Sequence, residues 1–302
     1  MTAIAVTGSQ TARLRRLAPG TLATAPSVIY LVLVTQLPFV VTVYLSLHQW
    51  NLLHPERGVS FVGLSNYLSL AVDPVFQIAV LNTVIFTTEA VAATTIIGLG
   101  LALLLHHISF LRGLLYLFLL SPFLVMETVA PLLWKTYLLN PVYGLLNWFL
   151  SLFGIAGLDP LGQAPALTVM TIVTWQWTPF MMLILLAGLQ SRPEELVEAA
   201  RVEGARSFGV FRNVTLPHLR PFFAVGMLVE AILLLPLFGP IYVATYGGPG
   251  FRTANLTFDA YRLLTQQYEV GKAAACGVVT AALTMAVTVI LLRRVRLDVQ
   301  RS

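Results

Sequence analysis

Six long apolar runs are the most constraining feature of this sequence. They occupy residues 22–47, 78–105, 114–138, 166–189, 222–245 and 273–292. An α-helix needs about 20 consecutive apolar residues to cross the roughly 30 Å of hydrocarbon in a bilayer. The runs are continuous and do not alternate with polar residues, as the strands of a membrane barrel do. They predict an all-α, polytopic membrane protein with six transmembrane helices.

Composition supports this prediction and removes several function classes. Apolar residues make up 57% of the 302 positions and charged residues only 10%, whereas about a quarter of a soluble domain is charged. So few charges exclude a disordered chain, a nucleic-acid-binding domain and an ordinary cytosolic enzyme, and leave the lipid bilayer as the main partner. The single cysteine, Cys276, excludes an internal disulfide framework and a cysteine metal cluster. No metal site is expected.

The distribution of basic residues predicts the topology. The segment before the first run holds Arg13, Arg15 and Arg16, and six spans threaded from that side place most of the 18 Lys and Arg residues on it. Since basic residues are retained in the cytoplasm, both tails, 1–21 and 293–302, are expected there, in a multi-pass protein of the cell membrane. The +5 net charge is thus a topology signal.

A cleaved signal peptide is the alternative for the first run. The small residues 23–25 precede the apolar stretch instead of following it, and the stretch is too long for a signal peptide. A retained first span is therefore favoured.

Segment 191–221 is the longest polar stretch on the predicted cytoplasmic side. Ser191 is expected to cap a helix that has Pro193 in its first turn. Gly204 would then relax the backbone, and a second short helix would follow until Pro217 ends it. Pro221 would open the next span. The pattern predicts a helix, a bend and a second helix along the inner membrane surface.

The two short helices would each present an apolar side, the first through Leu196, Ala199 and Ala200 and the second through Phe208, Phe211 and Val214. One alternative is an amphipathic segment resting on lipid. Small side chains suit close approach by another protein, and carboxylates would be repelled by anionic headgroups. These carboxylates are Glu194, Glu195, Glu198 and Glu203. A docked protein partner is therefore favoured.

The same segment resembles the EAA loop of ABC-importer permeases, the binding-protein-dependent family. The resemblance is carried by Glu198-Ala199-Ala200, by Gly204 and by Val214-x-Leu216-Pro217. Two positions depart from the family pattern, because Glu203 stands where Asp is usual and Val214 where Ile is usual. The resemblance assigns contact with an ATPase to Glu198, Ala199, Ala200, Glu203, Gly204, Ala205, Phe208, Phe211, Leu216 and Pro217.

Two further stretches are similar to the carbohydrate branch of that family, the MalF/UgpA type. Residues 61–67, Phe-Val-Gly-Leu-Ser-Asn-Tyr, look like that branch's lead-in to the second span. Residues 245–250, Thr-Tyr-Gly-Gly-Pro-Gly, look like its outer loop before the last span. The resemblance covers about residues 60–292 and implies the ABC importer type I transmembrane-domain fold. Residues 75–292 would form that domain, preceded by a first span and outer loop at 22–74.

The resemblance implies a subunit of a larger importer. It would form half of a pathway for a sugar, polyol or related carbohydrate. A second homologous permease, two copies of a cytoplasmic ABC ATPase and an external solute-binding protein would complete the assembly. The chain itself is expected to be no enzyme and to hold no cofactor. Its Gly271-Lys272 pair has Gln266 where a P-loop needs its first glycine, so ATP and Mg²⁺ are expected on the partner ATPase.

A few polar and aromatic residues within the runs are candidates for the solute pathway: Asn82, Glu127, Trp175, Trp177 and Glu230. Ionisable groups at membrane depth usually face a cavity or a partner, and tryptophan can stack on a sugar. The structural alternative is that the carboxylates pin helices together and the indoles pack.

The predicted outer loops offer a docking surface for an external partner. Its candidate residues are Tyr246, Gly247, Gly248 and Pro249. Interfacial anchoring is the alternative for the Tyr and Trp residues of these loops.

Small residues at every fourth position mark expected helix contacts. They are Ala90, Thr94, Gly98 and Ala102 in one run and Ala273, Gly277 and Ala281 in another.

Two other functions stay open at this point. One is an ion-coupled secondary transporter with Glu89, Glu127 or Glu230 as a proton relay, and the other is a permease of the same family for a non-carbohydrate solute. A membrane-embedded enzyme is not supported, because no Ser/His/Asp set and no HExxH helix is present.

Overall fold

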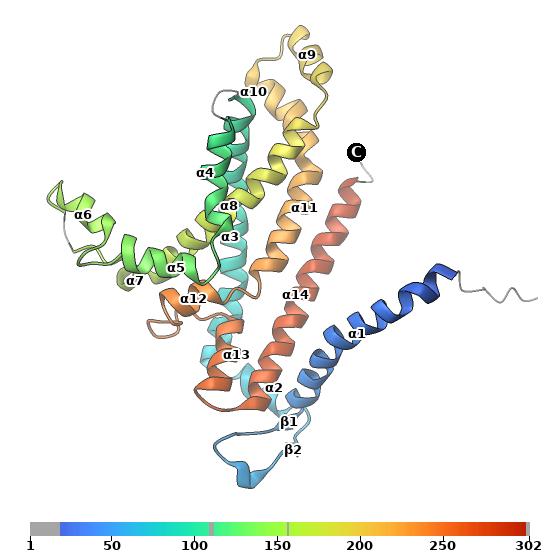
Figure 1. Cartoon of the computed structure of the whole chain (residues 1–302), viewed down its shortest axis with the longest axis vertical. Coiled ribbons are helices and arrows are strands. Elements are labelled where there is room, and N and C mark those ends of the chain that lie inside the picture. Colours follow the sequence, from blue (N-terminus) through green and yellow to red (C-terminus); the bar gives the residue numbers. More distant parts are fainter. Residues whose placement is uncertain (1–18, 109–111, 156, 300–302) are drawn as a thin grey trace, which may run out of the picture.

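The computed structural model describes residues 19–108, 112–155 and 157–299, so the basic residues Arg13, Arg15 and Arg16 and the last residues, 300–302, lie outside the described part. The described chain is almost entirely helical (Figure 1). Its five long helices are α1 (Pro19–Ser46), α3 (Pro74–His107), α8 (Pro165–Gln190), α11 (Leu216–Leu234) and α14 (Val270–Val299). The shorter helices are α2 (Ser65–Ala71), α4 (Arg112–Leu124), α5 (Val129–Leu133), α6 (Leu145–Ser151), α7 (Pro160–Gln163), α9 (Glu194–Val202), α10 (Ser207–Val210), α12 (Gly239–Ala244) and α13 (Leu256–Thr265).

The helices confirm the prediction of six spans. Within the described residues, five helices are long and apolar enough to cross a bilayer. A bent pair, 113–124 and 129–138, whose two parts meet at 98°, gives the sixth when the pair is counted as one span. The second part consists of α5 and the π-helical turn η2 (Trp134–Leu138). The run at 114–138, expected as one straight helix, is therefore broken near its middle.

The predicted small-residue stripe on α3 packs closely against α8. Ala90, Thr94, Gly98 and Ala102 are all buried. A Cβ atom placed on Gly98 would lie 3.0 Å from the backbone nitrogen of Met182 in α8. Above and below this crossing, apolar clusters join α3 and α8 to α11 and to the α12–α13 region. The stripe thus sets the spacing of the central helix pair, as close packing by small residues requires.

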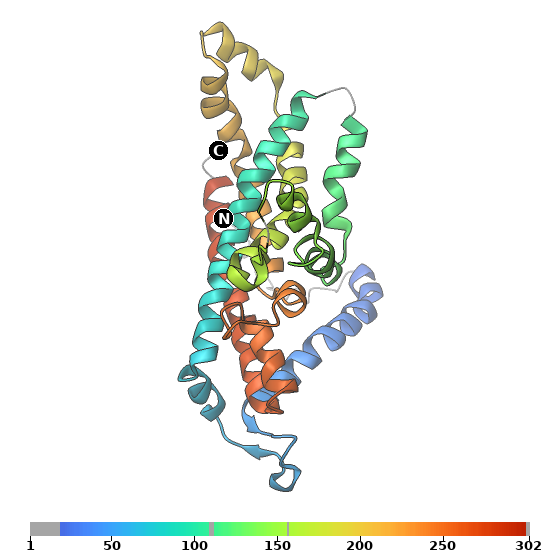
Figure 2. The ribbon, with the colours of Figure 1, turned by 90° about the vertical axis from the view of Figure 1, so that its left-hand side faces the viewer.

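The second stripe lies on α14, where α14 meets α1. A Cβ atom on Gly277 would lie 3.9 Å from the Thr42 Cγ2 atom of α1. Beyond this contact α1 leaves the bundle as a separate arm (Figures 1 and 2), and side chains such as Tyr30 and Leu31 are exposed.

The span expected at 222–245 begins earlier and ends earlier than predicted. Helical structure runs without a break from Ser207 through the π-helical turn η3 (Phe211–Thr215) to Leu234. The expectation that Pro217 ends a helix is wrong, because Pro217 is the second residue of α11 and follows the wider turn. Such a position tolerates the missing N–H of proline. The chain then breaks after α11 and resumes as α12.

A short hairpin closes the end of the bundle opposite α9 (Figure 2). It pairs β1 (His48–Gln49) with β2 (Ser60–Phe61), His48 opposite Phe61, and contains the 3₁₀ turn η1 (Pro55–Arg57). The Asn66 side chain of α2 donates to the carbonyls of Ser46 and His48, each at 2.9 Å. This amide ties the end of α1 to the start of the second span.

Candidate functional site

Residues 191–221, here called the elbow, project beyond one end of the bundle (Figures 1 and 2). The elbow contains α9, a turn, α10 and the first residues of α11. Gly204 lies in the turn with φ of +87°. The amide of Ala205 donates to the Ala200 carbonyl at 2.9 Å and that of Gly204 to the Arg201 carbonyl at 3.0 Å, the pattern of a Schellman C-cap. The predicted first helix and bend are confirmed, whereas the second helix is the start of the span that continues to Leu234 and is not a separate short helix.

The start of α9 differs from the prediction. Pro193, with extended backbone, precedes the first helical residue, and no side chain caps α9. The Ser191 hydroxyl instead donates to the Gly188 carbonyl at 2.9 Å. Ser191 therefore closes the end of α8, because the extended Pro193 separates it from the free amides of α9.

The elbow presents an exposed surface of mixed chemistry. Leu196, Val202 and Phe208 have exposed fractions of 51%, 89% and 73%. Glu198, Ala199 and Gly204 are also exposed, whereas Val197 and Val210 face inward. None of the ion pairs among the described residues involves a residue of the elbow. Exposed apolar side chains thus stand beside charged side chains that form no ion pair within the described chain, as they do on surfaces that bind other proteins.

The base of the elbow is fixed to both adjoining spans. The guanidinium of Arg192, just after α8, donates to the hydroxyl of Thr215, just before α11. His218 of α11 lies 3.1 Å from the Gly188 carbonyl of α8. A Cβ atom on Gly188 would meet Leu219 and Phe222 at 2.7 Å. The close approach and the two polar contacts make the elbow and the ends of these spans one mechanical unit.

Sequence reasoning did not single out these base residues. Arg192 entered it only as one of the basic residues that set the topology. A basic residue that immediately follows an apolar run and precedes Pro193 was the available signal, but its partner Thr215 is distant in sequence and only the fold brings the two together.

An Arg192→Met variant is expected to loosen this base. A hydrogen bond from a charged group contributes about 1.5–3 kcal/mol, so the variant should unfold at a lower temperature in detergent. Arg220→Met is the matched control, since Arg220 is an exposed arginine at the same end of the molecule. Equal effects of the two substitutions would contradict a bracing role for Arg192.

The two broken spans meet at Glu127. This residue lies in the bend between α4 and α5, and its Oε1 accepts from the amides of Phe238 at 3.3 Å and Gly239 at 3.0 Å. Those amides begin α12, after the break in the other span. The buried Gln176 of α8 donates to the free Val125 carbonyl of the first break at 2.8 Å. At each break, backbone groups lose their hydrogen bonds within the helix, and these side chains bond to them instead. A membrane interior requires this, because no water is available there to form the missing bonds.

The two candidate tryptophans belong to different clusters. Trp175 packs edge-on against Trp134, with ring centroids 5.5 Å apart, and lines a groove of about 820 Å³ between α3, α4 and α8. The same groove contains the exposed carboxylate of Glu89. Trp177 instead packs with Phe123 and Phe180 at centroid distances of 5.7 and 5.9 Å. The structure therefore does not bring the two indoles to one site.

Asn82 and Glu230 lie in different surroundings. The Asn82 amide donates to the carbonyls of Arg252 and Ala254 at 2.9 and 2.8 Å, which ties α3 to the segment before α13. This arrangement fits the alternative in which polar groups hold helices together. Glu230 is 0% exposed within α11, and neither of its carboxylate oxygens has a hydrogen-bond partner among the described residues.

The loop between α12 and α13 is built around packed aromatic rings. Tyr246 is half-exposed and has φ of +54°, and its ring packs against Phe258 at 5.6 Å. Gly247, with φ of +77°, lies so close to the Phe258 ring that a Cβ atom would meet it at 2.3 Å. Gly248 and Pro249 line a cavity of about 410 Å³ together with Lys135. The four predicted docking residues therefore share one turn, in which Tyr246 and Pro249 are exposed and Gly247 is buried.

A buried ion pair between Arg262 and Asp259 of α13 lies beside this loop. Arg262 lies 2.7 Å from Asp259 and 3.6 Å from Asp73 at the start of α3, and its guanidinium stands over the Phe251 ring. Burial raises the pKa of Asp259 above its ordinary value, and the charge and hydrogen bond of Arg262 oppose that rise. The pair joins the loop to α3 and α13.

Comparison with known proteins shows which family this chain is similar to. Residues 95–297 match the family described as "Binding-protein-dependent transport system inner membrane component". The trehalose/maltose transport system permease protein MalF of Thermococcus litoralis is 37% identical, over 85% of this chain and 86% of that protein. The trehalose transport system permease protein SugA of Mycobacterium tuberculosis is 34% identical, over 90% of this chain and 86% of that protein.

A solved structure with the same fold contains a similar chain. It is a bacterial alginate ABC transporter in complex with an alginate pentasaccharide-bound periplasmic protein, with a TM-score of 0.76, 20% identity, and coverage of 89% of this chain and 91% of that one. The fold is that of type I importer permeases. The chain therefore belongs to the family of binding-protein-dependent transport system inner membrane components.

Proposed function

We propose that this chain is the permease subunit of an ATP-driven importer and forms half of its translocation pathway. The elbow is the observation that carries the proposal, because exposed Leu196, Val202 and Phe208 lie on a unit braced to both α8 and α11. A separate cytoplasmic ABC ATPase, present in two copies, would bind this surface. ATP and Mg²⁺ would be bound by that partner. The contacts assigned to Glu198, Ala199, Ala200 and Gly204 belong to the same proposal.

The elbow would act as a rigid lever. When the ATPase dimer closes, the elbow moves, and the brace at Arg192 passes that motion to α8 and α11. Of the two breaks joined by Glu127, one ends α11 and the other separates α4 from α5 and is bonded to α8 through Gln176. Broken helices near the membrane centre are where transporters bind solutes and rearrange. The motion would therefore switch the pathway between two access states.

The solute is proposed to be a sugar, a polyol or a related carbohydrate. The relatives' names support this class, since two of them refer to trehalose or maltose. An external solute-binding protein would deliver it to the exposed turn at Tyr246, Gly247, Gly248 and Pro249. A second homologous permease would supply the other half of the pathway, with the elbow and both termini in the cytoplasm.

Purification of the chain from its native membrane tests the proposal. An ABC ATPase and a second permease should co-purify, and in proteoliposomes ATP hydrolysis should rise several-fold when the binding protein and its sugar are added. Uptake should stop on ATP depletion and survive a protonophore. Uptake that instead collapses with the proton gradient, without an associated ATPase, would identify an ion-coupled transporter. Stimulation by a non-carbohydrate solute alone would reassign the substrate class.

A further inference from the structure

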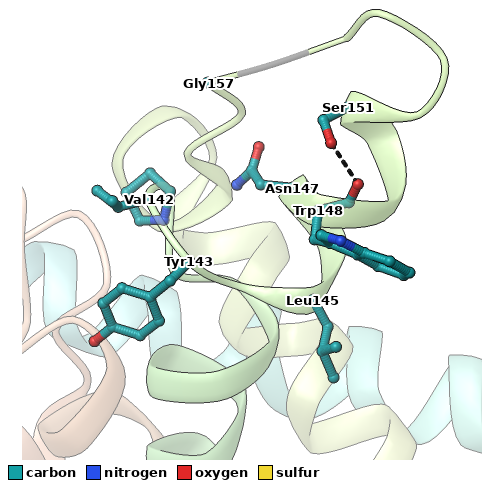
Figure 3. Close-up of a pocket in the computed structure, with 8 residues that line it drawn as sticks. Val142, Tyr143, Leu145, Asn147, Trp148, Ser151 and Gly157 are labelled. Atoms are coloured by element: carbon teal, nitrogen blue, oxygen red, sulfur yellow. Dashed lines mark hydrogen bonds between the residues drawn. The ribbon is translucent and has the colours of Figure 1, made fainter.

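Residues 140–155, here called the α6 hairpin, have an inverted distribution of polar and apolar groups. The hairpin stands at the edge of the bundle (Figure 1). Its residues line an open hollow of about 620 Å³ (Figure 3). In a loop that faces water, polar side chains point outward and large apolar ones are covered or scattered singly. In this hairpin the reverse holds.

The polar side chains are used inside the hairpin. Asn147 is 5% exposed, donates to the Leu158 carbonyl at 2.7 Å and accepts from the Leu158 amide at 2.9 Å. The Asn140 side chain accepts from the Val142 amide at 2.9 Å. The Ser151 hydroxyl donates to the Trp148 carbonyl at 2.6 Å (Figure 3). Because of these bonds, the polar groups of the hairpin already have partners and do not need water, which a hydrocarbon environment would not provide.

The large apolar side chains point outward. Figure 3 shows Trp148 and Leu145 directed away from Asn147. Between half and nearly nine-tenths of each of these side chains is exposed: Val142, Tyr143, Leu145, Trp148, Phe149, Leu152, Phe153 and Ile155. The sequence from 136 to 158 contains no Asp, Glu, Lys, Arg or His. A surface this apolar and without charge fits lipid better than a polar protein partner.

The position of the hairpin agrees with a lipid environment. It lies beside α7 and the Pro165 end of α8 (Figure 1). The 26 residues of α8 extend about 39 Å at 1.5 Å per residue, which exceeds the roughly 30 Å of hydrocarbon. The Pro165 end therefore reaches the interfacial layer, where Trp and Tyr are enriched.

Two other loops at that end are built differently. The loop that carries Tyr246 packs its rings on Phe258 and Tyr261 and pairs Arg262 with Asp259. The turn within the β1–β2 hairpin carries the charged residues Glu56 and Arg57. Residues 58–72, which follow that turn, are a second uncharged stretch with exposed apolar side chains, so such a surface is shared by two segments at this end and is absent from the Tyr246 loop.

We propose that the α6 hairpin is an interfacial membrane anchor, with its apolar side chains at the boundary of headgroups and acyl chains. Because the hairpin carries no charge, it binds neutral and anionic phospholipids equally. It holds the bend at α5 and the Pro165 end of α8 at a fixed depth while the elbow moves the opposite end of α8. The proposal uses the membrane location of the chain and does not depend on the solute.

Spin-label accessibility tests the proposal in the whole reconstituted transporter. A nitroxide is attached to cysteine in a Cys276→Ser, Leu152→Cys chain, and its collision rates with oxygen and with the water-soluble nickel complex NiEDDA are compared. Gln267→Cys, in an exposed polar turn, is the water control, and Ile96→Cys, exposed on α3, is the hydrocarbon control. The oxygen-to-nickel ratio at Leu152 should be at least about fivefold above that at Gln267, in phosphatidylcholine vesicles with or without phosphatidylglycerol.

Three outcomes would overturn the anchor. A ratio at Leu152 equal to that at Gln267 places the hairpin in water. Protection that develops only when the external binding protein is added makes the surface a protein-docking site. Protection seen only with anionic lipid contradicts the uncharged anchoring argued above. Because collision rates are read without transport, failure of the importer assignment would leave this measurement intact.

Discussion

A Gly204→Asp variant is expected to insert into the membrane and fold, yet to lose at least tenfold in solute uptake. Gly204 has φ of +87°, and a Cβ atom there would meet nothing within 4 Å. The folded chain therefore has room for the new side chain, and the left-handed backbone costs about 1 kcal/mol for Asp, which tolerates it better than most residues. The free space is where the ATPase is proposed to approach, and a bulky carboxylate there should prevent close contact.

The measurement compares uptake, ATP hydrolysis and thermal unfolding in the same preparations. Gly63→Asp is the matched control, because Gly63 also has positive φ, +56°, and open surroundings but lies in the turn that follows β2 at the opposite end of the molecule. Both variants should unfold within a few degrees of the unmodified chain, and only Gly204→Asp should lose transport. Normal uptake by Gly204→Asp would remove the elbow from the coupling mechanism.

The architecture could be predicted from the sequence because its main determinants are local. A helix that crosses a bilayer must be a long apolar run, so the six spans were visible without any partner residue. Gly204 in the turn and the buried stripe at Ala90, Thr94, Gly98 and Ala102 follow equally from local spacing.

The details that sequence could not predict depend on distant partners. At the break between α4 and α5, the Glu127 carboxylate accepts from the amides of residues 238 and 239. At the base of the elbow, Arg192 donates to the Thr215 hydroxyl. Trp175 and Trp177 are both predicted pathway residues because an indole can stack on a sugar, yet helix geometry directs them to different neighbours. A residue's type suggests its chemistry, but whether that chemistry serves a solute or a neighbouring helix is decided by the tertiary contacts.

A Gly98→Leu variant is expected to reduce the amount of folded chain at least tenfold. The neighbour that a Cβ atom would approach to 3.0 Å is the backbone nitrogen of Met182, and the Met181 Cβ lies at 3.2 Å. Neither atom can rotate away as the tip of a flexible side chain can, so α3 and α8 would have to separate along a contact that joins buried clusters. Overpacking of a core costs about 1–3 kcal/mol and occasionally more, and a leucine at a backbone contact should reach the upper end of that range.

Gly100 provides the matched control two residues further along the same helix. It is exposed, and a Cβ atom there meets nothing within 4 Å. Since both substitutions change helix propensity by the same amount, in the favourable direction, any difference between them measures the α3–α8 contact alone. Size-exclusion recovery and thermal unfolding in detergent should show Gly100→Leu at or slightly above the stability of the unmodified chain and Gly98→Leu far below it. If the two variants were equally stable, the spacing of α3 and α8 would not depend on the missing side chain at 98.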